Sequence, residues 1–109
     1  MSEIFAADLL EWRQVRPEVT SGVYGRTLLD AGVRIVLTRV DPGGGFRPHR
    51  DPYGHMFYFL TGEGIIRVEE NSAQAAPGLV VQVAPGELHS YENTGSSVLT
   101  LLSVNIAAD

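Results

Sequence analysis

Three histidines are the side chains in this sequence best suited to hold a metal ion. Two lie in a segment rich in glycine and proline (43–62), and the third lies in another such segment (78–93). A carboxylate follows the first histidine by two positions, and imidazole and carboxylate together suit divalent first-row metals. Ligands of this type do not select among Fe, Mn, Ni, Cu, Co and Zn. The candidate ligands are His49, Asp51, His55 and His89.

Each candidate also has a structural interpretation. A single histidine in a strand more often serves packing or the protein surface than metal binding. Asp51 begins the sequence Asp-Pro-Tyr-Gly, which favours a type I turn with Asp at its first position. These separate interpretations do not explain why every histidine falls in one of the two glycine- and proline-rich segments. Their clustering therefore favours one shared site, with Asp51 as either a ligand or a turn former.

Other kinds of catalytic chemistry find little support. The chain has no cysteine and no lysine, which excludes disulfides, thiolate nucleophiles and lysine Schiff bases. The glycines at 43–45 precede neither a helix nor a lysine, so a phosphate-binding loop is not expected. No Gly-x-Ser-x-Gly elbow is present for a serine nucleophile.

The elements that must position the histidines are short strands. Turn signals recur about every ten residues, and no segment beyond the N-terminus has helical periodicity, which predicts an all-β sandwich or barrel. We expect a helical or irregular lead-in over 1–11, a complete break at 41–45, a hairpin turn at 61–64 and a polar connection over 71–78. The predicted strands are 12–15, 23–29, 33–40, 55–60, 65–69, 79–83, 88–92 and 98–106.

Strand alternation predicts which side chains share a face with the candidate ligands. Asp51 shares its face with His49, while His89 shares its face with Tyr91. His55 shares its face with Phe57. If those faces line one barrel interior, three imidazoles and one carboxylate converge against an aromatic wall.

The two segments resemble the paired motifs of the cupin superfamily, G-x5-H-x-H-x3/4-E-x6-G and G-x5-P-x-G-x2-H-x3-N. This sequence has Ala84 at the motif proline, Asp51 at the second motif histidine and His55 at the motif glutamate. The last two changes swap the positions of a histidine and a carboxylate, so the total of three imidazoles and one carboxylate is preserved. The matching residues are Gly43, His49 and Gly62 in the first motif and Gly78, Gly86, His89 and Asn93 in the second.

The resemblance implies a single-domain cupin β-barrel (double-stranded β-helix or jelly roll) over 1–109, with its motifs at 43–62 and 78–93. It also implies that His49, Asp51, His55 and His89 are ligands of one divalent transition metal ion. If Asp51 is too short to reach the ion, a three-histidine site remains, similar to that of the thiol and diketone dioxygenases of this superfamily.

The functions implied by this resemblance are those of small cupins. These include dioxygenases, isomerases and epimerases of sugars, and enzymes acting on unsaturated uronates. The alternatives are a non-catalytic module that binds or senses a small ligand, and a structural cupin whose histidines serve packing. No catalytic acid or base is identified, and the candidates for substrate binding are Arg47, Phe57 and Tyr91.

Composition limits the partners. Apolar residues make up 44% and charged residues 19%, which indicates a folded globular domain. The net charge of −5 and the lack of a basic patch argue against nucleic acid, and the absence of a leader or long apolar run favours a cytoplasmic protein without membrane contact. The last strand is apolar on both faces, which predicts a homodimer.

Overall fold

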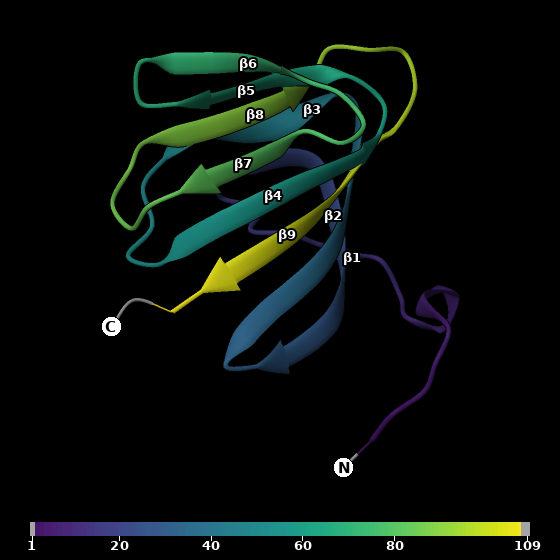
Figure 1. Cartoon of the computed structure of the whole chain (residues 1–109). Helices are drawn as coiled ribbons and strands as arrows, with labels where there is room; N and C mark the ends of the chain where they lie inside the picture. Colours follow the sequence, from purple (N-terminus) through teal and green to yellow (C-terminus); the bar gives the residue numbers. More distant parts are fainter. Residues whose placement is uncertain (1, 108–109) are drawn as a thin grey trace.

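The computed structural model describes residues 2–107, which form a curled barrel of antiparallel strands (Figure 1). Its only helical element is a single 3-10 turn, and no helix within residues 2–107 has the length and apolar character needed to cross a membrane. The elements are η1 (Ala7–Leu9), β1 (Arg13–Gln14), β2 (Thr20–Ala31), β3 (Val33–His49), β4 (Gly54–Thr61), β5 (Gly64–Val68), β6 (Asn71–Ala75), β7 (Val80–Val83), β8 (His89–Asn93) and β9 (Leu99–Ile106).

The strand order β6-β5-β8-β3-β9-β4-β7 divides into two layers that share the long strand β3. The first part of β3, residues 33–40, pairs with β9, and its last part, residues 45–49, pairs with β8. In Figure 1 the β6, β5 and β8 layer lies opposite the β7, β4 and β9 layer. The fold is therefore the all-β barrel expected from the sequence.

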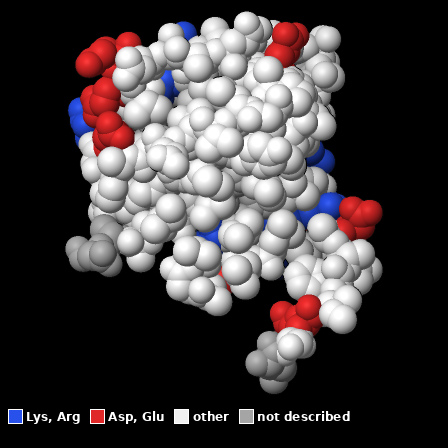
Figure 2. All heavy atoms as spheres, viewed as in Figure 1, with Lys and Arg blue, Asp and Glu red and all other residues white. Residues whose placement is uncertain are grey.

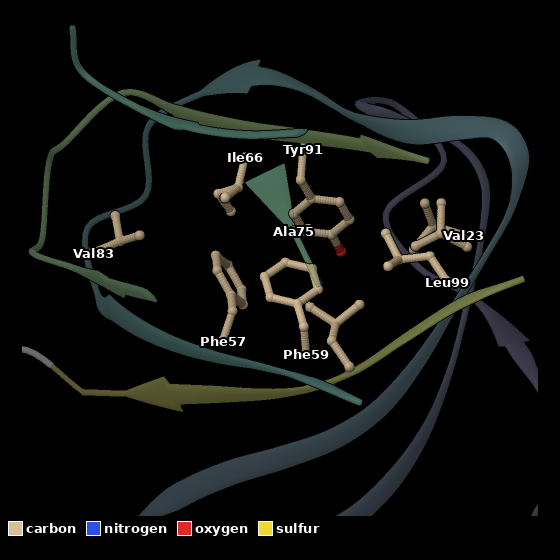
Figure 3. Close-up of a cluster of buried hydrophobic side chains, with 10 residues drawn as sticks. Val23, Phe57, Phe59, Ile66, Ala75, Val83, Tyr91 and Leu99 are labelled. Carbon is tan, nitrogen blue, oxygen red and sulfur yellow. The ribbon is translucent and has the colours of Figure 1, made fainter. Parts of the chain in front are cut away.

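Apolar side chains from both layers meet between them and form the core (Figure 3). Phe59 is fully buried, and the ring of Tyr91 from the opposite layer meets it edge-on with 6.4 Å between centroids. Phe57 also meets Tyr91 edge-on, at 5.6 Å. The buried apolar residues are Val23, Val40, Phe57, Phe59, Ile66, Ala75, Val83, Tyr91, Leu99 and Leu101.

Three local predictions are wrong. The Asp41–Gly45 segment does not end the strand, because β3 continues through it and only its register with β2 shifts. The Thr61–Gly64 turn joins no hairpin, because β4 pairs with β7 and β9 while β5 pairs with β6 and β8. The polar segment after Asn71 contains strand β6, which completes the edge of its layer.

Gly45 lets β3 cross between the layers. A β-carbon at this position would lie 2.3 Å from the carbonyl oxygen of Tyr91, closer than any side chain can approach. Glycine therefore allows β3 to lie directly against β8, where Gly45 pairs with Glu92 and His49 pairs with His89. This close contact sets the register that brings two of the three histidines together.

The N-terminal segment before β2 packs along the outside of the barrel wall. The Trp12 ring contacts two guanidinium groups, with Cζ of Arg26 at 4.1 Å and Cζ of Arg39 at 4.8 Å from its centroid. Asp8 adds a salt bridge of 3.1 Å to Arg26. Such cation–π contacts contribute about 0.5–2 kcal/mol each, so the segment is held in place although it has little regular structure.

Candidate metal centre

Three strands and one loop bring the four predicted ligands together. His49 ends β3, His89 begins β8 directly opposite it, and His55 lies on β4 in the other layer. Asp51 lies in the connection between β3 and β4, where its side chain is only 4% exposed. An aspartate that only formed a surface turn would leave its carboxylate in water, so the burial of Asp51 supports a role inside the site.

The three imidazoles surround one carboxylate oxygen. Oδ2 of Asp51 lies 2.9 Å from Nε2 of His55, 3.2 Å from Nε2 of His49 and 3.6 Å from Nε2 of His89. Two donors that each lie about 2.1 Å from a metal are about 3.0 Å apart at a right angle and about 3.4 Å apart at a tetrahedral angle. The measured spacings fit ligands of one metal ion.

One group of possible ligand atoms within residues 2–107 contains three of these residues. The ligand atoms of His49, Asp51 and His89 all lie within 4.8 Å of one another, which defines a candidate metal site of two imidazoles and one carboxylate. His55 approaches the same group through the Asp51 oxygen. Whether His55 is a fourth ligand or a hydrogen-bonding partner of Asp51 stays a prediction.

Hydrogen bonds at the far side of each ring orient the imidazoles. Nδ1 of His49 donates to the carbonyl of Arg47 at 2.7 Å, and Nδ1 of His89 donates to the carbonyl of Glu87 at 2.9 Å. A carbonyl only accepts, so both Nδ1 atoms carry a proton, and each ring turns its Nε2 toward the centre. Nδ1 of His55 contacts Oδ1 of Asn105 at 2.9 Å in the same manner.

The donor set at the centre suits a cation. Nδ1 of His49 and of His89 points to a backbone carbonyl, so their Nε2 atoms face the Asp51 carboxylate, and a divalent metal ion would accept lone pairs from all three groups. Nε2 of His55 forms a hydrogen bond with the same carboxylate oxygen. The donor set and its orientation therefore fit a metal ion held by His49, Asp51 and His89.

The pKa values of His89 and Asp51 favour the protonation states that a metal needs. Burial, opposed by the Glu87 carbonyl, lowers the pKa of His89 below its ordinary value, so this ring is neutral near pH 7. Burial alone would raise the pKa of Asp51, but hydrogen bonds from Arg16 and His55 and the charge of Arg16 outweigh it, and the pKa is lowered. Asp51 thus offers an anionic carboxylate and His89 a neutral imidazole.

Arg16 is the residue of this site that sequence reasoning missed. Its Nη1 donates to Oδ1 of Asp51 at 2.7 Å, and its Nε donates to Glu18 at 3.2 Å. Arg16 has a left-handed backbone, with φ of 39°, directly before Pro17, and the Thr20 hydroxyl holds it by donating to its carbonyl. Such unfavourable conformations persist where surrounding contacts enforce them. Because Arg16 holds one carboxylate oxygen, the other faces the imidazoles.

The centre opens into a cavity of about 660 Å³. Phe46, Phe57 and Tyr91 line its apolar wall, and the N-terminal segment from Leu9 to Arg16 forms another wall. Phe57 and Tyr91 thus lie where a substrate would contact them. Their proposed role in substrate binding stays a prediction.

Arg47 does not line this cavity. It borders a separate depression of about 440 Å³ beside the glycines of β3, and its guanidinium donates to the carbonyl of Glu18. The arginines that do line the main cavity are Arg13, Arg16 and Arg34.

The fold and the site together define the class of this protein. It is a small β-barrel in which imidazoles and a carboxylate at the base of a cavity form a candidate site for one metal ion. The chain belongs to the cupin family, because the family model described as "Cupin domain" matches residues 36–105. That match includes all four predicted ligands. It confirms the family resemblance and the fold expected from the two motifs.

Solved structures with the same fold come from several bacteria. A predicted oxalate decarboxylase from Thermotoga maritima has a TM-score of 0.88 and 23% identity, covering 97% of this chain and 100% of that one. The polyketide cyclase RemF from Streptomyces resistomycificus has a TM-score of 0.87 and 20% identity, and the match covers 96% of this chain and 79% of RemF. KdgF from Halomonas sp. has a TM-score of 0.83 and 16% identity, and the match covers 100% of this chain and 97% of KdgF. A search of curated proteins finds no match.

Proposed function

We propose that this cupin is a metal-dependent enzyme that acts on a small organic molecule, of the dioxygenase or the sugar or uronate isomerase type. The observation that carries the proposal is the convergence of the imidazole Nε2 atoms on Oδ2 of Asp51 at the base of the cavity. Two of the structural neighbours are described as a predicted oxalate decarboxylase and a polyketide cyclase, so the same fold is associated with chemistry on small organic molecules.

The surrounding residues prepare the centre for such chemistry. A bound divalent ion would act as a Lewis acid that polarises a substrate oxygen. Arg16 and Asn105 orient Asp51 and His55, while Phe46 and Phe57 exclude water from one side of the cavity. Burial raises the pKa of Tyr91 far above neutral pH, so its phenol stays protonated and can donate a hydrogen bond but not act as a base.

The test begins with elemental analysis of the purified protein, followed by oxygen-uptake assays of the Fe(II)-reconstituted form with small acids and diketones. We expect about one metal ion per chain, with uptake of oxygen supporting the dioxygenase type. Conversion of a sugar or uronate without oxygen uptake would support the isomerase type. Tightly held zinc or nickel with binding but no turnover would instead support the non-catalytic module, and a chain that binds no metal would contradict the metal-dependent enzyme.

We also propose a homodimer, formed through the outer face of the β4 and β9 layer. Leu102 and Val104 alternate with the buried Leu101 and therefore point outward, next to Tyr58 and Met56 of β4. Figure 2, in the view of Figure 1, shows charged side chains at the edges and few over this layer. A largely apolar sheet face suits a second copy of itself, because a two-fold contact places the same surface of both copies against each other.

Replacing Tyr58 with glutamate is expected to halve the mass of the particle measured by light scattering, since Tyr58 is 39% exposed on this face and would place a charge within it. Val98→Glu is the matched control, because Val98 is 37% exposed but precedes β9 outside the face. A wild-type protein that is monomeric, or a Tyr58→Glu variant that stays dimeric, would contradict this interface.

The remaining expectations about partners stay predictions. Neither the absence of nucleic acid and membrane partners nor a cytoplasmic location follows from the barrel itself. Both rest on composition and charge.

A further inference from the structure

The cavity contains two arginines that have no carboxylate partner. Within residues 2–107, five arginines form salt bridges with a carboxylate: Arg16, Arg26, Arg39, Arg50 and Arg67. Arg47 donates to a backbone carbonyl. The other two, Arg13 and Arg34, line the cavity. The guanidinium groups without a carboxylate partner are therefore on the wall that a ligand would contact.

Arg34 lies close to the metal centre through a short chain of neighbours. It is directly opposite Asn105 in the pairing of β3 with β9, and residues opposite each other in a sheet share a face. Oδ1 of Asn105 in turn contacts His55. Arg34 is also opposite Asp30 of β2, but the two side chains form no salt bridge in the described chain. The only hydrogen bond of the Arg34 side chain in residues 2–107 is a long one, 3.4 Å from Nη2 to the hydroxyl of Thr27. Most of its donors remain free for a ligand.

The inner face of the barrel changes character toward Arg34. On β3 and β9 the inward residues run from the fully buried Val40 and Leu99 to Thr38 and Ser103, whose hydroxyls are 3.0 Å apart, and then to the Arg34 and Asn105 pair. The cavity is lined by the polar part of this face, from Thr38 and Ser103 to Arg34 and Asn105, and by the apolar rings of Phe57 and Tyr91. A lining of this kind suits a molecule with a carbon skeleton and a charged end.

The charge of the cavity differs in sign from that of the whole chain. Its lining contains three arginines but only two carboxylates, Glu11 and Asp51, whereas the chain carries a formal net charge of −5. A bound divalent cation would increase this local excess of positive charge. The lining of the cavity therefore favours an anionic ligand over a cationic one, although the whole chain is acidic.

We propose that the cavity binds a small organic acid and that Arg34 binds its carboxylate group, with Arg13 as the second cation of this anion subsite. Guanidinium groups bind carboxylates through two parallel hydrogen bonds, which gives both affinity and orientation. The inference names a substrate class for the proposed metal-dependent enzyme and in that respect rests on it. The subsite itself is made of protein groups and does not require the metal.

Calorimetric titrations of the metal-free and the zinc-loaded protein test the proposal. The probes are malonate, succinate and glucuronate, each compared with its neutral amide. We expect at least one carboxylate to bind both forms at least about tenfold more tightly than its amide. Arg34→Gln should weaken that binding about ten- to a hundredfold, because a hydrogen-bonded charge pair is lost. Arg34→Lys keeps the charge but cannot form the two parallel hydrogen bonds. Its affinity for the acid should therefore lie between those of the wild type and of Arg34→Gln.

Arg67→Gln is the matched control, since Arg67 is an exposed strand arginine outside this cavity. The variants should retain the wild-type melting temperature and zinc content. Equal binding of acids and amides, no binding of any acid, or unchanged binding by Arg34→Gln would overturn the proposal. Acid binding that depends on Arg34 in a protein that takes up no zinc would keep this subsite and reject the metal enzyme. Zinc binding without acid binding would reject this subsite and leave the proposed metal-dependent enzyme standing.

Discussion

Replacing His89 with glutamine is expected to weaken metal binding by more than about a hundredfold. His89 is 2% exposed, and with His49 and Asp51 it forms the group of possible metal ligands found in residues 2–107. Loss of a residue that only orients a ligand typically costs 10- to 100-fold in metal affinity, so loss of a ligand itself should exceed that range. Elemental analysis after dialysis, together with the visible spectrum of the Co(II) form, measures the effect.

The same measurement on three further variants defines the ligand set. If His49, Asp51 and His89 hold the ion, His49→Gln and Asp51→Asn should lower the metal affinity as much as His89→Gln does. His55→Gln should do so only if His55 is a fourth ligand, and otherwise its effect should stay within the range of an orienting residue. Unchanged metal content in Asp51→Asn would indicate the three-histidine version of the site.

Tyr53→Phe provides the control for these variants. Tyr53 lines the same cavity, and its ring lies 5.0 Å from that of His55, but phenylalanine preserves this contact. The Tyr53→Phe variant should therefore bind metal with the affinity of the wild type. Full metal occupancy in all four ligand variants, with folding intact by circular dichroism, would disprove the metal centre.

Replacing Phe59 with alanine is expected to lower the free energy of unfolding by about 3–5 kcal/mol, because it leaves a cavity between the two layers. Phe59 is fully buried and contacts Tyr91 edge-on, as Figure 3 shows. The total stability of a domain of this size is about 5–15 kcal/mol, so the variant should be near the limit of folding. Urea denaturation followed by circular dichroism gives the value.

Phe5→Ala is the matched control for that experiment, since Phe5 is 45% exposed and precedes the barrel. Its effect should stay within about 0.5 kcal/mol. A loss below about 1 kcal/mol in Phe59→Ala would mean that the layers close over the missing ring and that the core is less tightly packed than its burial indicates.

Local alternation of apolar residues was sufficient to predict most strands. The strand expected over 33–40 forms the first part of β3, and the aromatic segment after Gly54 forms β4. The continuation of β3 through Asp41–Gly45 was not predictable in this way. Glycine and proline usually end a strand, but here Gly45 is needed for the close approach of β8, which is a long-range requirement.

The candidate ligands were predictable because histidine is rare in this chain and lies only in the two motif segments. The residues that orient them were not. Arg16 is 35 positions before Asp51, and Asn105 is 50 positions after His55, so no local spacing connects them. Arg34 was one of eight arginines, and only the folded structure shows that it faces the cavity without a carboxylate partner in the described chain.

The N-terminal segment and the barrel supply different parts of the candidate site. The imidazoles come from the strands of the barrel, whereas Arg16 and one wall of the cavity come from the segment before β2. That segment is held by the pairing of β1 with β2 and by the contacts of Trp12 with Arg26 and Arg39. Substitutions there would reshape the wall that a ligand contacts while leaving the strands that carry the histidines unchanged, so we expect ligand preference to be altered most readily in this segment.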